Sequence, residues 1–222
     1  MASPQKLPDD VLAVIAAQVG SSLEDEGVGG EVGGGPGVDS PQPLGPSPGP
    51  QSGYTLAEGF EVWTFTPGMT DEYEDGNRHL SDLVRPSGIW HHQIRINGSP
   101  ECFARSKPLG STAQSWSVRE VFRSPLAKDV DEAIDWIDSH VPDEVEARLL
   151  SVPFQQTEAF WFVTKPNSTL ADEWNDKLLI LMAPRRFSQL KPGTLVNSST
   201  FLEAMAGPKP GEGLSRKRRS TV

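Results

Sequence analysis

Apolar and polar residues alternate along several short stretches of the chain, a period of two that indicates β-strands. These stretches, together with short runs that are apolar throughout, are 60–66, 89–96, 101–106, 116–122, 146–152, 158–164 and 177–182. The last two are apolar at almost every position, so we expect them at the centre of a sheet. Asn97 and Gly98 favour a β-hairpin with a three-residue loop, in which Ile94 would lie opposite Cys102.

Other stretches repeat their apolar residues with the helical period. The clearest helix begins with Ser124 as N-cap and Pro125 at its first position. Its apolar stripe consists of Leu126, Val130, Ile134 and Ile137. A shorter helix is expected over 8–19, ended by Gly20, and another over 199–206.

The order of these elements predicts an α+β fold. We expect a single domain with a mixed, mostly antiparallel sheet of about six or seven strands and with helices on one face. The stretch 116–152 has the length of a β-α-β crossover, which would make one pair of strands parallel.

Composition divides the chain into four parts. Residues 27–53 contain ten Gly, six Pro and three Ser, so they cannot bury enough apolar surface to offset the entropy of ordering. We therefore expect a short amphipathic helix within 1–19, a disordered linker over 20–53, the α+β domain over 54–206 and a disordered basic tail over 207–222.

Charge and cysteine content narrow the class of protein. The net charge of −10 makes general attraction to nucleic acid or to an anionic membrane unfavourable. Cys102 is the only cysteine, so no disulfide can form within the chain and a reducing, cytoplasmic environment is the simpler assumption. No apolar run approaches the roughly 18 residues of a transmembrane segment.

The predicted hairpin holds the residues best suited to catalysis, His91, His92 and Cys102. His92 would share a face with Cys102, as in a thiolate–imidazole pair or half of a metal site. His91 would point to the opposite face, because adjacent strand residues do. An inert buried cysteine is the alternative, since no second Cys/His group completes a zinc site. We expect neither a metal nor a cofactor.

Three surfaces suit contacts with a partner. The apolar face of the first helix either docks on the domain or binds a partner's groove, and its residues are Val11, Leu12 and Ile15. Asp131, Asp135 and Asp138 lie opposite the apolar stripe of the clearest helix, as a solvated face or as a contact for a basic partner or the chain's own tail. The basic residues of that tail are Arg216, Lys217, Arg218 and Arg219.

These features favour a non-catalytic interaction or adaptor protein, whose partner is another protein. Nucleic acid would bind only through the basic tail. The alternative is a small enzyme or ligand-binding domain with its site near the hairpin at 89–105. The two hypotheses make different predictions: an enzyme needs a concave pocket that holds His92 or Cys102, whereas an adaptor needs an exposed apolar patch or sheet edge.

Overall fold

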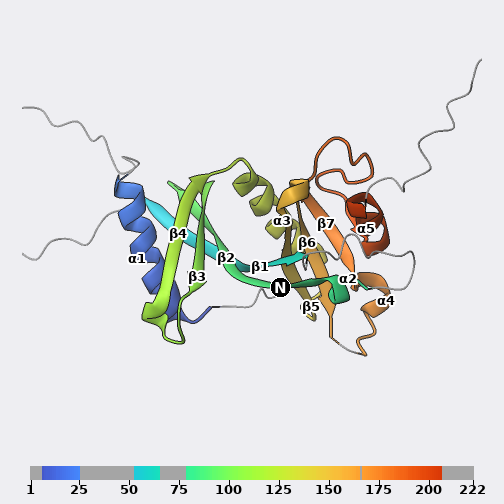
Figure 1. The fold of residues 1–222 in the computed structure, drawn as a ribbon, viewed down its shortest axis with the longest axis horizontal. Coiled ribbons are helices and arrows are strands. Elements are labelled where there is room, and N and C mark those ends of the chain that lie inside the picture. Colours follow the sequence, from blue (N-terminus) through green and yellow to red (C-terminus); the bar gives the residue numbers. More distant parts are fainter. Residues whose placement is uncertain (1–6, 26–52, 66–78, 166, 207–222) are drawn as a thin grey trace, which may run out of the picture. The chain divides into compact units, whose positions relative to one another are not determined.

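The computed structural model describes residues 7–25, 53–65, 79–165 and 167–206 (Figure 1). Its strands form one sheet of eight, in the order β4-β3-β2-β1-β5-β6-β7-β8. The strands are β1 (Tyr54–Phe65), β2 (Val84–Ile96), β3 (Ser99–Pro108), β4 (Trp116–Arg123), β5 (Val145–Val152), β6 (Thr157–Thr164), β7 (Lys177–Met182) and β8 (Leu195–Asn197). The α-helices are α1 (Asp9–Asp25), α2 (Leu80–Leu83), α3 (Leu126–His140), α4 (Ala171–Trp174) and α5 (Ser198–Ala206). Two short 3-10 helices cover Ala113–Ser115 and Pro153–Gln155.

The α+β class and the mixed, mostly antiparallel sheet predicted from the sequence are confirmed. Strands β3 and β4 pair antiparallel, and so do the neighbours from β5 to β8, whereas β1 and β5 pair in parallel. The sheet has eight strands where six or seven were expected. The added strand is β8, whose three residues are too short for an alternation of apolar and polar residues to stand out in the sequence.

The chain divides into two compact units. We name each after one helix that lies entirely within it, α1 in the first and α5 in the second. The α1 unit comprises Leu7–Gly59 and His91–Ala127, and the α5 unit comprises Phe60–Trp90 and the chain from Lys128 onward. Strands β1 and β2 contribute residues to both units, since each passes from one to the other along its length.

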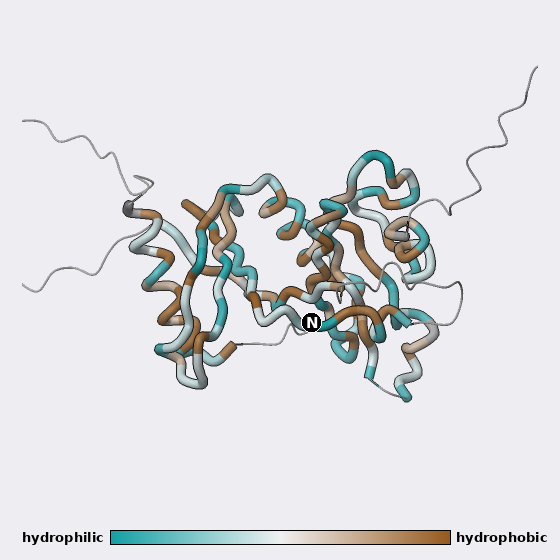
Figure 2. The backbone as a smooth tube through the Cα atoms, viewed as in Figure 1, coloured by the Kyte–Doolittle hydropathy of each residue, from teal (hydrophilic) through white to brown (hydrophobic). Residues whose placement is uncertain are grey.

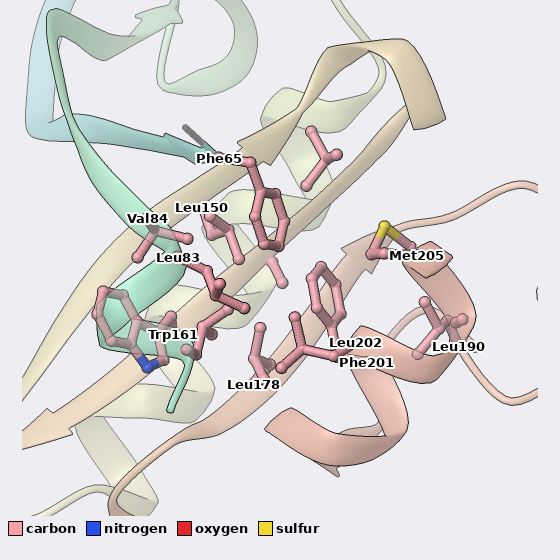
Figure 3. Close-up of a cluster of buried hydrophobic side chains, with 14 of the residues drawn as sticks. Phe65, Leu83, Val84, Leu150, Trp161, Leu178, Leu190, Phe201, Leu202 and Met205 are labelled. Atoms are coloured by element: carbon pink, nitrogen blue, oxygen red, sulfur yellow. The ribbon is translucent and has the colours of Figure 1, made fainter. Parts of the chain in front are cut away.

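The core of the α5 unit lies on one face of strands β5, β6 and β7. Leu150, Trp161 and Leu178 from these strands pack with Phe201 and Leu202 of α5 (Figure 3). All five side chains are almost fully buried. Burial of several large apolar side chains is the main favourable term for folding, at roughly 1.5–3 kcal/mol for each.

Helix α3 lies against the opposite face of the same strands. Its Trp136 contacts Phe162, the strand neighbour of Trp161, with ring centroids 6.5 Å apart. Neighbouring residues of a strand point to opposite faces, so α3 and α5 cover different faces. The expectation that the helices share one face is therefore corrected. Strands that are apolar on both faces, as β6 and β7 are, need a covering layer on each side.

In the α1 unit, α1 covers a face of the hairpin and of β4. It buries Val11, Ile15, Val19 and Leu23, one or two residues in every turn, and its apolar and polar positions alternate along its length (Figure 2). The helix extends to Asp25, six residues beyond the predicted range of 8–19, so it includes the first residues assigned to the linker. The rest of that linker and the tail lie outside the described residues.

Gly20, the predicted end of the helix, lies within it for a reason that the sequence alone does not show. A β-carbon at Gly20 would lie 2.6 Å from the hydroxyl oxygen of Tyr54. That hydroxyl donates a hydrogen bond of 2.8 Å to the carbonyl of Ala16. Glycine is required here for the close approach of a neighbouring side chain and does not end the helix.

The hairpin and the crossover also differ in detail from the prediction. Two turn residues, Asn97 and Gly98, join β2 to β3 in place of a three-residue loop, and both have positive φ angles of 50° and 84°. Such a turn matches the twist of the paired strands. The chain from β4 through α3 to β5 does not make these two strands neighbours, because β5 pairs with β1.

Candidate functional site

His91 is the buried member of a polar cluster in the α1 unit. Arg105 Nε donates a hydrogen bond of 2.8 Å to His91 Nε2, and the same guanidinium binds the carboxylate of Glu120. The rings of Phe103 and Phe122 lie 6.0 and 6.4 Å from the imidazole. Burial, with the charge of Arg105 beside it, lowers the pKa of His91 to about 3. The imidazole is therefore neutral, and Arg105 already uses the lone pair that a general base would need.

His92 points to the other face of β2 and is fully buried. Its Nε2 lies 2.7 Å from the hydroxyl oxygen of Ser106. A β-carbon at Gly59 would lie 2.6 Å from His92 Nδ1, so the ring fills the space that a side chain on β1 would take. Within the described residues, Nδ1 has no hydrogen-bond partner. Burial lowers the pKa of His92 to about 4.

Cys102 is also enclosed. It is 2% exposed and packs with Ile94 and Ala104 beneath α1. The residues that line the two cavities described below include neither histidine nor Cys102. The hairpin thus carries two neutral, buried imidazoles and a buried thiol, and this arrangement suits packing better than catalysis.

A second polar cluster surrounds Arg148 in the α5 unit, and no pattern in the sequence indicates it. Arg148 donates two hydrogen bonds to Glu146, of 2.8 and 3.0 Å. Its guanidinium carbon lies 4.2 Å from the ring centroid of Trp63 and 5.2 Å from that of Trp161. Burial raises the pKa of the neighbouring Glu61, although the charge of Arg148 opposes this. The hollow at this cluster measures about 10 Å³, room for one water molecule, so it holds no substrate.

A larger hollow is a groove between α3 and β7, with a cavity volume of about 320 Å³. Leu179 and Leu181 of β7 form its apolar floor, and one side of α3 forms a wall. The turn at Pro192 and Gly193 forms the other border. Hydrogen bonds of 2.8 and 3.0 Å between this turn and the backbone of Ile180 hold the border in place. All of these residues belong to the α5 unit.

The wall of the groove is acidic and aromatic. Asp129, Glu132, Ala133 and Trp136 face the cavity. The two carboxylates are exposed, and the Nζ atom of Lys128 lies 3.6 Å from the Glu132 carboxylate. Exposed pairs of this kind contribute only about 0.3–0.5 kcal/mol. The groove therefore offers an apolar floor beside two exposed carboxylates.

The acidic residues named from the sequence lie on the other flank of α3. At 3.6 residues per turn, Asp131, Asp135 and Asp138 point away from the stripe of Asp129, Glu132 and Trp136. The i, i+3, i+7 spacing of Asp129, Glu132 and Trp136 is visible in the sequence. What the sequence could not show is which flank of the helix borders a hollow.

The remaining predicted contact residues are placed as follows. Val11 and Ile15 are buried in the α1 unit and Leu12 is partly buried, so this apolar face docks on the protein's own sheet. The basic residues Arg216, Lys217, Arg218 and Arg219 lie outside the described residues.

Both edges of the sheet are protected against pairing with another strand. The side chain of Gln18 accepts a hydrogen bond of 2.8 Å from the Val118 amide and donates one of 2.9 Å to the Trp116 carbonyl. These two bonds occupy the edge of β4 at Trp116 and Val118. The register of β4 shifts between Val118 and Glu120, where the edge strand becomes irregular. The other edge, β8, has only three residues. Short, irregular or covered edges disfavour the addition of a strand.

Comparison of the chain with models of known protein families, with curated proteins and with solved structures gave no match. None of the helices in the described ranges is both long and apolar enough to cross a membrane. Across the same ranges, no three His, Cys, Asp or Glu side chains gather as a metal site would require. The geometry of the groove is therefore the main guide to function.

Proposed function

We propose that the protein is a non-catalytic interaction module, and that its groove between α3 and β7 binds a short peptide segment carrying an aliphatic residue and basic residues. The observation that supports this most directly is the cavity of about 320 Å³, apolar at its floor and lined by Asp129 and Glu132 at its wall. Its volume falls at the lower end of the range for ligand pockets. A cytoplasmic location remains a prediction from the single cysteine.

The chemistry of the groove favours a peptide over other ligand classes. Two carboxylates repel the phosphates of nucleic acids and the headgroups of anionic lipids, and the chain as a whole carries a charge of −10. Leu179 and Leu181 offer an aliphatic side chain a place to leave water, at roughly 25 cal/mol for each Å² buried. Because both sheet edges are protected, the groove is the better candidate for docking.

Fluorescence anisotropy with labelled peptides tests this function. The probe is the peptide GLSRKRRS, which joins one leucine to four basic residues, and the two controls are GLSEEEES and GGSRKRRS. The protein is the full chain with Arg216→Gln, Lys217→Gln, Arg218→Gln and Arg219→Gln, so that this basic run of the chain cannot compete; we call it the tail-neutral variant. We expect GLSRKRRS to bind, GGSRKRRS to bind more weakly and GLSEEEES not to bind.

Two matched pairs of substitutions locate the site. Asp129→Asn with Glu132→Gln removes both carboxylates from the groove, whereas Asp135→Asn with Asp138→Asn makes the same change of charge on the other flank of α3. We expect the first pair to weaken binding of GLSRKRRS about tenfold, equivalent to about 1.4 kcal/mol, and the second pair to change it little. Equal effects of the two pairs, or no binding of GLSRKRRS by the tail-neutral variant, would refute the proposed function.

A further inference from the structure

The chain contains a segment with both features of the proposed ligand, an aliphatic residue and basic residues. Residues 214–219 read Leu-Ser-Arg-Lys-Arg-Arg, an aliphatic residue and one serine followed by four basic residues. The groove presents the complementary pair of features, an aliphatic floor at Leu179 and Leu181 beside the carboxylates of Asp129 and Glu132. A carboxylate and a cation that meet beside an apolar surface attract each other more strongly than they do in open water.

The length of chain that follows α5 is sufficient for this contact. Helix α5 ends at Ala206, which leaves ten residues to Arg216. An extended chain covers at most about 3.3–3.6 Å per residue, so these ten residues reach up to about 33–36 Å. Layers of secondary structure pack about 10 Å apart, and the path from the α5 face to the α3 face crosses roughly two such distances around β8.

We propose that residues 214–219 occupy the groove between α3 and β7 within the same chain, as an intramolecular latch that a partner's basic segment must displace. Leu214 lies on the floor, and the basic residues pair with Asp129 and Glu132. This inference rests on the proposed function of the groove. A covalent connection of this length gives the segment an effective concentration on the order of a millimolar, so a weak contact is enough to compete.

The unmodified chain and the tail-neutral variant differ in a predictable way. If the segment alone binds the groove with a Kd of about 100 µM, an effective concentration of about a millimolar lets the attached segment compete with the probe. The apparent affinity of GLSRKRRS then falls about tenfold. We therefore expect the unmodified chain to bind the probe about tenfold more weakly than the tail-neutral variant. In the background of Asp129→Asn with Glu132→Gln, the four tail substitutions should change probe binding little, because the latch has lost its site.

The outcomes separate the two proposals. If the tail-neutral variant does not bind the probe, the proposed function itself fails. If it binds the probe no better than the unmodified chain does, the latch fails while the function of the groove stands. If the tail substitutions strengthen probe binding as much in the Asp129→Asn, Glu132→Gln background, their effect is one of overall charge, and the latch is again refuted.

A direct measurement complements the competition. The indole N–H resonance of Trp136, assigned through Trp136→Phe, reports on the wall of the groove in an NMR spectrum. We expect it to shift between the unmodified chain and the tail-neutral variant at low protein concentration, while the resonance of Trp116 in the α1 unit stays in place. A shift that fades on dilution would mean contact between two copies and would overturn a latch within one chain. An unchanged Trp136 resonance would overturn it as well.

Discussion

His91 and His92 are neighbours in sequence, yet they are buried in two different environments. His91 accepts a hydrogen bond from Arg105, and His92 lies against Ser106 and fills the space beside Gly59. Alternation along a strand predicts this separation, and the contacts bear it out. The sequence could not predict that both imidazoles are enclosed and neutral, because burial depends on the strands and the helix that cover them.

Burial of the two histidines makes stability depend on pH. Their pKa values in the folded protein are about 3 and 4, below the value of 6.5 expected in the unfolded chain. The unfolded chain therefore binds more protons between these limits, and stability falls as the pH falls through this range. Each histidine should cost about 2 kcal/mol between pH 7 and pH 5, measured as the free energy of unfolding in urea.

The variant His92→Asn should reduce the difference in unfolding free energy between pH 7 and pH 5 by about half, because His91 still contributes its share. A free energy of unfolding that stays constant between these values in the unmodified chain would contradict the burial of both imidazoles.

Helices and strands could be predicted from the sequence where the stretch of residues was long enough to show a period. The predicted ranges for β5, β6, β7 and α3 agree with the structure within a few residues. The three residues of β8 are too few to show a period. The predicted range of α1 was too short because a glycine such as Gly20 is found both at the end of a helix and at a close contact within one. Only the position of Tyr54 decides between the two.

Gly20→Ala tests this explanation of α1. Alanine is the better helix former by about 1 kcal/mol, but its β-carbon would lie 2.6 Å from the Tyr54 hydroxyl. We expect the substitution to destabilise the protein by about 1–3 kcal/mol, as overpacking does. In the background of Tyr54→Phe the hydroxyl is absent, and the same substitution should be neutral or stabilising. A double-mutant cycle of unfolding free energies measures this coupling, and additive effects would contradict the close contact.

Helix α3 shows why the candidate site was only half predictable. Its sequence indicates an acidic amphipathic helix, whose contact would be a basic partner or the chain's own tail. The stripe predicted as its contact surface, Asp131, Asp135 and Asp138, lies on the other flank of the helix. A groove forms at the border between the buried and exposed faces, where Asp129 and Glu132 adjoin Ala133 and Trp136. That border depends on the neighbouring strand and turn, which the sequence of the helix does not contain.

At the scale of the whole molecule, the net charge of −10 acts on any basic ligand before contact. Such long-range attraction raises the rate of association and is screened by salt, whereas contacts inside a groove mainly set the rate of dissociation. If the groove binds a basic peptide as proposed, most acidic residues of the chain attract it from a distance, and the two that line the groove contact it.

Binding kinetics should separate these two groups. Raising NaCl from about 50 mM to about 500 mM should slow association of GLSRKRRS with the tail-neutral variant and change its dissociation little, because the Debye length falls from more than 10 Å to less than 8 Å. Asp135→Asn with Asp138→Asn should slow association only slightly, whereas Asp129→Asn with Glu132→Gln should accelerate dissociation. Stopped-flow anisotropy measures both rates. If the groove substitutions altered association alone, the carboxylates would act only at a distance and the groove would not be the binding site.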